Sequence, residues 1–106
     1  MIYMYAWEYV VRAGKEVEFL AAYGPEGAWV QLFRGSPGYL RTELHRDRGN
    51  GSRYVTLDYW DSAEAWSRFR RDRSREFEEL DERCEHLTVT EREIGRFEPV
   101  GGEKPG

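Results

Sequence analysis

The sequence predicts an α+β domain whose elements follow the order strand, helix, strand, strand, helix, strand. Three observations predict it. Residues 2–11 are a mostly apolar, aromatic-rich run typical of a strand. Residues 39–60 indicate two strands around a glycine-rich turn, and an apolar stripe at helical spacing runs over residues 66–87. Two such halves form the split βαβ, ferredoxin-like arrangement: a four-stranded antiparallel sheet with two helices on one face.

Length and composition are typical of one globular domain. The chain has 106 residues, of which 15% are aromatic and 34% are charged, and its net charge is -4. This balance gives no reason to expect a nucleic-acid or membrane partner, and no apolar run approaches membrane-spanning length. Cys84 is the single cysteine, which excludes an internal disulfide. We expect a cytoplasmic protein without a signal peptide, with a domain at residues 1–98 and a flexible tail at 99–106.

The first strand, residues 2–11, is apolar on both faces. Successive strand side chains point to opposite faces, so a strand with one wet face alternates apolar and polar residues. Here one face carries Tyr3, Tyr5, Trp7, Tyr9 and Val11, and the other carries Ile2, Met4, Ala6 and Val10, interrupted by Glu8. The helices cover one face. The second layer therefore comes from another copy of the chain or from a large ligand.

A helix follows the turn at residues 12–15 and carries Val17, Phe19, Leu20 and Tyr23 at helical spacing. Residues 24–27, with the sequence Gly-Pro-Glu-Gly, interrupt it because glycine and proline are poor helix residues. A short second piece over residues 28–33 is expected to turn inward Trp29, Leu32 and Phe33.

The next two strands span residues 39–45 and 54–60, and residues 47–52 between them have strong turn chemistry. If the hairpin is centred on Gly49 and Asn50, its register follows directly.

In that register Arg41 lies opposite Asp58, and His45 lies opposite Tyr54. The simplest interpretation makes Arg41 and Asp58 a structural ion pair at a dimer seam. The functional alternative makes Arg41 the binder of a phenolate or carboxylate.

The last helix is predicted to start at an N-cap Asp61 with Glu64 three residues later, a variant of the capping box. It then shows one continuous stripe over about six turns, formed by Trp66, Phe69, Arg73, Phe77, Leu80, Cys84 and Leu87. Residues 89–97 form a weaker last strand, in which Gly95 indicates a bulge.

Three stretches of the chain resemble the antibiotic biosynthesis monooxygenase (ABM) family. They are residues 5–16 (YAWEYVVRAGKE), 36–40 (SPGYL) and 58–66 (DYWDSAEAW), the last with a tryptophan and an acidic residue before the second helix. The resemblance spans roughly residues 2–98. It implies a dimeric α/β barrel in which two sheets pack face to face, with the helices outside and a pocket in each subunit.

Some members of this family oxidise polycyclic aromatic polyketides without metal or flavin, and others degrade haem. The haem-degrading members use an Asn on the first strand and a Trp and a His on the second helix. The corresponding positions here hold Trp7, Phe69 and Glu79, none of them the family residue, which counts against haem degradation. The sequence also shows no metal-ligand cluster and no glycine-rich phosphate-binding fingerprint. We expect no cofactor.

The substrate pocket is expected between the second helix and the sheet, with Trp66 and Phe69 as walls and Trp7 facing it. Packing in the core or at an interface is the alternative role of such aromatics. His45 is the candidate general base, because the ordinary pKa of histidine lies near 6.5. Exposure near the end of its strand is the alternative for His45.

Two functions are compatible with these residues. The first is a cofactor-independent monooxygenase acting on a small or polycyclic phenolic or quinol substrate. The second is a non-catalytic homodimer that binds a small apolar ligand. In both cases we expect a homodimer that buries on the order of 2,000 Å² and covers Ile2, Met4, Ala6 and Trp60.

Overall fold

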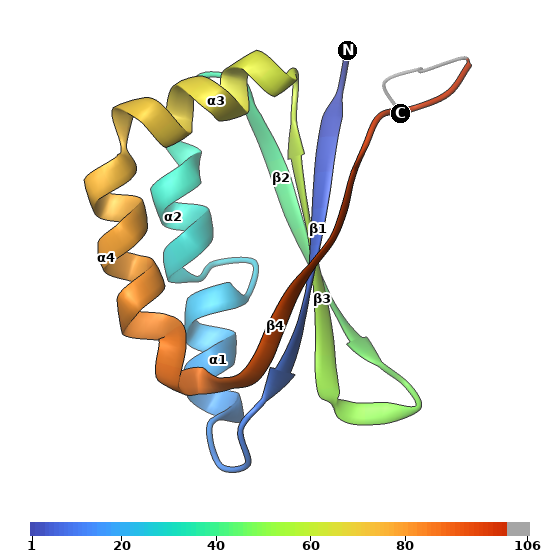
Figure 1. Ribbon diagram of the computed structural model, residues 1–106, viewed down its shortest axis with the longest axis vertical. Coiled ribbons are helices and arrows are strands. Elements are labelled where there is room, and N and C mark those ends of the chain that lie inside the picture. The colour runs from blue at the N-terminus through green and yellow to red at the C-terminus, as the bar shows by residue number, and fades with distance from the viewer. Residues whose placement is uncertain (102–106) are drawn as a thin grey trace.

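The computed structural model describes residues 1–101 and has the predicted ferredoxin-like α+β fold (Figure 1). Its four strands form one antiparallel sheet in the order β2-β3-β1-β4. They are β1 (Tyr3–Val11), β2 (Tyr39–Asp47), β3 (Asn50–Trp60) and β4 (Thr88–Phe97). The helices are α1 (Glu16–Tyr23), α2 (Ala28–Arg34), α3 (Ala63–Asp72) and α4 (Ser74–Cys84), followed by a short 3₁₀ turn η1 (Glu85–Leu87). Most of the predicted tail at 99–106 lies outside the described residues.

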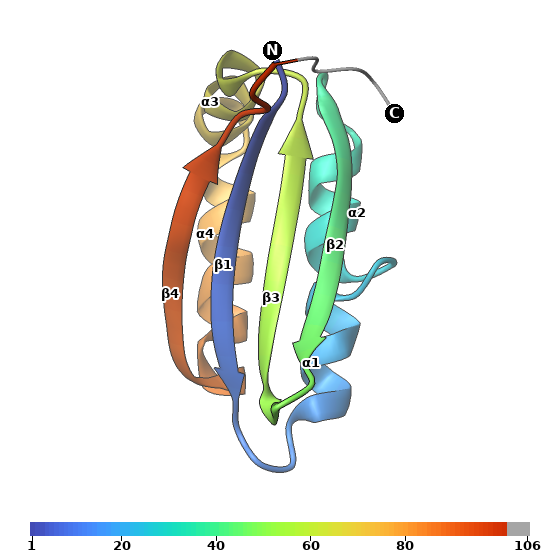
Figure 2. The same ribbon diagram turned by 90° about the vertical axis from the view of Figure 1, so that its right-hand side faces the viewer.

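All helices lie on one face of the sheet. Figure 2 shows the sheet in front with the helices behind it, so the opposite face, here called the outer face, carries no helix. No helix in the described part of the chain is long and apolar enough to cross a membrane. A single copy of the chain therefore places helices over only the inner face of β1, although the small Ala6 on the outer face is also buried.

The core between the sheet and the helices is built from aromatic rings. Trp60, Phe19 and Phe69 are its largest fully buried side chains. Trp60 was expected on the outer face, and this expectation is wrong: its ring lies against Phe33, 5.7 Å between centroids, beneath the helices. From Tyr54 onward the even-numbered residues of β3 face inward and are buried, and Trp60 ends that series.

The first helical segment is divided at residues 24–27, as predicted. Its buried residues are Phe19, Ala22 and Tyr23, whereas Val17 and Leu20 are exposed, against the sequence expectation. Phe19 and Tyr23 lie one turn apart on the helix face that packs on the core. Leu20 follows Phe19 by one residue, which rotates its side chain by about 100° away from that face.

The start of α3 differs by one residue from the predicted cap. Ser62, not Asp61, is the N-cap, and its hydroxyl accepts a hydrogen bond from the Ala65 amide at 3.0 Å. The Asp61 amide instead donates to the Gly38 carbonyl at 2.8 Å. Gly38 has φ +90°, and a Cβ there would lie 2.5 Å from that of Ala65, so this turn requires glycine.

The second helical segment is not continuous. It breaks at Arg73, whose φ of -120° and ψ of 30° are not helical, into α3 and α4. Figure 1 shows that α3 runs across one end of the molecule, whereas α4 runs along the sheet. The apolar stripe still faces the core at Phe69, Leu80, Cys84 and Leu87.

The hairpin between β2 and β3 has a different register from the predicted one. Arg41 pairs with Tyr59, Thr42 with Asp58 and His45 with Val55. The loop is tighter than expected, with Asp47 paired to Asn50, and the register shifts between Arg46 and Asp47. Because side chains alternate with period two, this slip of one residue puts Arg41 and His45 on the outer face and Asp58 and Tyr54 on the inner face, so neither predicted cross-strand pair forms.

β4 carries the bulge that Gly95 indicates. Ala6 pairs with Gly95 and the next residue, Trp7, pairs with Glu93, so Ile94 is the extra residue. The bulge lets Arg96 and Glu93 both face the helix side of the sheet, where they bond to each other at 3.1 Å.

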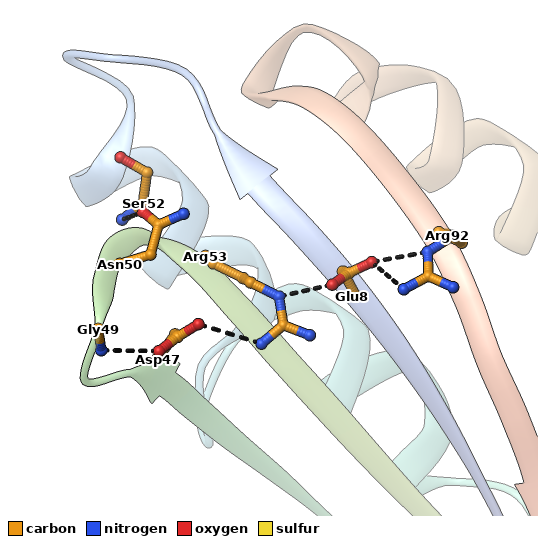
Figure 3. Close-up of polar contacts among 7 residues, drawn as sticks. All are labelled: Glu8, Asp47, Gly49, Asn50, Ser52, Arg53 and Arg92. Carbon is orange, nitrogen blue, oxygen red and sulfur yellow. Dashed lines mark hydrogen bonds and ion pairs between the residues drawn. The ribbon is translucent and has the colours of Figure 1, made fainter.

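The outer face carries an ion cluster of four residues from four strands (Figure 3). Glu8 accepts hydrogen bonds from Arg53 at 2.5 Å and from Arg92 at 2.7 Å. Arg53 also reaches Asp47 at 3.2 Å. The two arginines hold the pKa of Glu8 below its ordinary value. Glu8, which interrupts the apolar pattern of β1, is thus neutralised on the uncovered face of the sheet.

Candidate functional site

A cavity of about 310 Å³ lies between the inner face of the sheet and the helices. Most of its lining is aromatic and comes from Tyr3, Tyr5, Trp7, Tyr9, Tyr23, Trp29, Phe33, Trp66 and Phe77. The polar and charged lining residues are Thr42, Thr56, Asp58, Arg70, Asp81, Glu91, Glu93 and Arg96. A cavity of this size and lining suits a flat aromatic molecule.

The floor of the cavity is made by β1 and β3. In the antiparallel register Tyr5 stands opposite Asp58 and Trp7 opposite Thr56. Facing residues on one side of a sheet are in contact range, so the aromatic residues of β1 and the polar residues of β3 form a single surface.

Asp58 is the buried carboxylate of this floor, with only 6% of its surface exposed. The Thr42 hydroxyl donates to its Oδ1 atom at 2.5 Å. Since Thr42 has one hydroxyl proton, the Tyr39 hydroxyl, 2.9 Å from Thr42 Oγ1, donates to it. A chain of hydrogen bonds thus runs from β2 to the carboxylate and fixes its orientation.

Burial raises the pKa of Asp58 to about 6, and hydrogen bonds from Thr42 and Tyr5 limit the rise. Burial and the neighbouring carboxylate raise the pKa of Tyr5 well above its ordinary value. At neutral pH the cavity therefore combines an ionised, poorly hydrated carboxylate with a phenol that keeps its proton. The first can accept a proton from a bound molecule, and the second can donate a hydrogen bond.

Trp66 of α3 forms one wall. Its ring lies 4.6 Å from that of Tyr5 across the core. Behind it, Phe69 is stacked on Trp66 at 5.6 Å with an interplanar angle of 28°. Phe69 is buried and does not itself line the cavity. It therefore supports the wall from behind.

Charged groups stand where α3, α4 and β4 meet. The Arg70 guanidinium lies over the Phe77 ring, 3.8 Å from its centroid. Arg96 is held by Glu93 at 3.1 Å. Burial, together with the nearby Asp81, raises the pKa of Glu91.

The structure brings together only some of the residues that the sequence singled out. Trp7 and Trp66 line the cavity, and Phe69 lies directly behind it. Arg41 and His45 are on the outer face and are not among the lining residues.

The expected pair of Arg41 and Asp58 is not formed. Arg41 bonds to Glu43 at 3.1 Å and lies over the Tyr59 ring at 3.9 Å. His45 is exposed and contacts Glu43 at 3.1 Å. A catalytic role for His45 stays a prediction.

The sequence around Asp58 indicates a buried acid, although its expected role was an ion pair with Arg41. It lies between buried residues on the inward side of β3, among Tyr54, Thr56 and Trp60. A carboxylate in an otherwise uncharged inward series indicates a buried acid, and such groups gather at functional sites. No sequence pattern indicates that Thr42 belongs to the site, because only the observed register places it beside Asp58.

Comparison with known proteins identifies both a family and a fold. The family model described as antibiotic biosynthesis monooxygenase matches residues 2–83. No curated protein sequence matches the chain. Its structure is similar to that of SnoaB, a cofactor-independent oxygenase from Streptomyces nogalater, with a TM-score of 0.76 and 20% identity over 93% of each chain.

Two further solved structures share the fold. Rv0793 from Mycobacterium tuberculosis is 13% identical, with a TM-score of 0.76 over 98% of this chain and 100% of its own. PA3566 from Pseudomonas aeruginosa is 17% identical, with a TM-score of 0.69 over 93% and 94%.

Proposed function

The chain belongs to the antibiotic biosynthesis monooxygenase family, and on that premise we propose that it is a cofactor-independent monooxygenase. Its substrate is a small or polycyclic phenol or quinol. The observation that carries the proposal is the Asp58 carboxylate, buried in an aromatic cavity with its pKa raised to about 6. A base of this kind remains ionised at neutral pH and is far more basic than an exposed aspartate.

Oxygenation without a cofactor requires the substrate to supply all the electrons. For 1-naphthol the balance is C₁₀H₈O + O₂ → C₁₀H₆O₂ + H₂O, and the product is 1,4-naphthoquinone. Asp58 takes the phenolic proton, and the electron-rich naphtholate passes an electron to O₂. Recombination forms a C–O bond at the carbon para to the oxygen, and Asp58 returns its proton to the resulting peroxide.

In the second half Asp58 removes the hydrogen from that ring carbon. The O–O bond breaks, a carbonyl forms, and the hydroxide that leaves takes the proton from Asp58 as water. Once Asp58 has taken the phenolic proton, the Tyr5 hydroxyl, which keeps its own proton, can turn from Asp58 and donate a hydrogen bond to the substrate oxygen that has become negative. Trp7 and Trp66 hold the flat ring and exclude water, with Phe69 as support.

Oxygen consumption with 1-naphthol tests this proposal, together with the absorption of the quinone product. The wild-type protein, freed of metal by a chelator and without flavin, should consume one O₂ per quinone formed. The Asp58→Asn variant keeps the size of the side chain and removes the base, so its turnover should fall by about 10²-fold or more.

The alternative is a non-catalytic homodimer that binds a small apolar ligand. The observation that favours it is that aromatic groups make up most of the lining and need no reaction to hold a ring. Binding of 1-naphthol without oxygen consumption would support this alternative and contradict the monooxygenase.

We further propose that two copies pair through their outer faces and act in the cytoplasm. Met4 and Val10 on that face of β1, and Val55 and Leu57 on that face of β3, are only half-buried, and no helix lies over that face. A second copy is the natural cover for such a face. Sedimentation at micromolar concentration tests the pairing, and a stable monomer that does not aggregate would contradict it.

A further inference from the structure

We propose that Arg70 binds a carboxylate on the substrate, so that the cavity selects aromatic hydroxy acids over neutral phenols. The inference rests on the proposed function only in taking this cavity as the substrate site. It adds a specificity-determining residue and a substrate class. Two observations carry it: Arg70 lines the cavity, and its guanidinium lies over the Phe77 ring, which also lines it.

The position of the guanidinium depends on the break in the helix at Arg73. Residues seven apart on a straight helix are separated by about 10 Å along the axis. The bend between α3 and α4 instead brings Arg70 to 3.8 Å above the ring of Phe77. The Phe77 ring is itself packed against Trp29, with centroids 5.0 Å apart, so this support is anchored in the core.

The flat face of the Arg70 guanidinium packs on the Phe77 ring, whereas the N–H groups at the edge of the guanidinium form no ion pair. Among the described residues, no carboxylate lies within ion-pair distance of Arg70, whereas the other cavity arginine, Arg96, is bound to Glu93. The N–H groups of a guanidinium lie in its plane, so stacking leaves the fork available. A planar fork of this kind matches a carboxylate with two parallel hydrogen bonds.

The other charged residues of the cavity favour binding of an anion at the end near Trp66. Glu91 pairs with Tyr9 on β1, whereas Arg96 pairs with Tyr5, nearer the wall formed by Trp66. Glu91 and the nearby Asp81 therefore lie toward the other end. At the end near Trp66, Glu93 is already bound to Arg96, and Asp58, opposite Tyr5 on the floor, is left for the phenol of the substrate. In this orientation a single flat molecule satisfies a cation and a base at two separate points.

The test compares two probes that differ by one carboxylate, 6-hydroxy-2-naphthoate and 2-naphthol. Dissociation constants are measured without oxygen by quenching of tryptophan fluorescence, at low and at high salt. The wild-type protein should bind the naphthoate at least tenfold more tightly than the naphthol at low salt. Arg70→Gln should abolish that preference and leave 2-naphthol binding unchanged.

Two further variants make the comparison specific. Arg71→Gln, at the exposed neighbouring position of α3, should behave as wild type. Arg70→Lys keeps the charge without the fork and should retain only part of the preference, which also gives a result if Arg70→Gln folds poorly. Equal affinity of the wild type for both probes, or an undiminished preference in Arg70→Gln, would overturn the inference.

The outcome is independent of turnover. If 1-naphthol is not oxidised but the preference disappears in Arg70→Gln, the catalytic proposal fails and the role of Arg70 stands. If 1-naphthol is oxidised but Arg70→Gln leaves the preference unaffected, the catalytic proposal stands and the role of Arg70 is refuted.

Discussion

Thr42 and Asp58 face each other across the β2–β3 pair, and the threonine hydroxyl donates to the carboxylate at 2.5 Å. The pair joins β2, the first strand of the hairpin and an edge of the sheet, to the floor of the cavity. It holds one carboxylate oxygen in place while burial raises the pKa of the group. The ionised carboxylate therefore lowers the stability of the fold while it is held at a fixed position, a pattern typical of functional sites.

The first prediction concerns the pH dependence of turnover. The pKa of Asp58 is about 6, and the carboxylate is the active form. Turnover of 1-naphthol should therefore rise with pH through about 6 and level off above it, measured as initial rates of oxygen consumption. A rate that is constant between pH 5 and 8 would show that another group takes the proton.

The second prediction concerns stability. The folded pKa of Asp58 is raised from 3.8 to about 6, so the folded state holds a proton that the unfolded state has lost. Stability is therefore lost as pH rises from about 4 to 6, by about 3 kcal/mol at 1.36 kcal/mol per pH unit. Asp58→Asn, which cannot ionise, should be more stable than wild type above pH 6 by an amount of this order.

That gain should shrink as pH falls toward 4, where the wild-type carboxyl is protonated. Urea unfolding of both proteins across this range measures it. A variant that is less stable than wild type at every pH would mean that the carboxylate contributes to folding more than burial costs.

The third prediction separates packing from ligand binding at Trp66. Trp66→Phe keeps most of the apolar surface, so its stability should fall by only about 1 kcal/mol. If the indole stacks on the substrate, affinity for 1-naphthol should weaken roughly three- to tenfold with the fold intact. Thermal unfolding and a ligand titration of the same variant distinguish the two, since unchanged affinity would leave Trp66 a packing role.

The fourth prediction tests His45, the candidate base of the sequence analysis. Its ring lies on the outer face and contacts Glu43 at 3.1 Å. His45→Ala should change neither the unfolding temperature nor the rate of 1-naphthol oxidation beyond about twofold. A loss of 10²-fold or more would instead make His45 the general base.

The fifth prediction concerns the ion cluster around Glu8. Arg53 and Arg92 lower the pKa of Glu8 below its ordinary 4.5, so the stability it contributes is present at neutral pH and is lost as pH falls. Glu8→Gln should be less stable than wild type at pH 7, and the difference should be smaller at pH 3. Glu79→Gln, at an exposed position of α4, is the control and should match wild type at both values.

Most of the fold was predictable because it depends on local patterns. The apolar run of β1, the break at residues 24–27 and the inward stripe at Phe69, Leu80 and Cys84 are local features of the sequence that any compact packing must respect. The break at Arg73 was not predictable in this way. Its sequence shows neither glycine nor proline, and the bend exists where two helical segments follow different parts of the sheet.

The sequence by itself determined that this chain folds as an α+β domain with an aromatic inner face, and that Trp7 and Trp66 are candidates for a pocket wall. Only the tertiary structure decided which polar residues share that pocket. The reason is the period of two along a strand: one slip at the β2–β3 turn exchanges the faces of a whole strand. That slip places Thr42 beside Asp58 and leaves Arg41 and His45 on the opposite face of the sheet from Asp58, and no pattern within either strand fixes it.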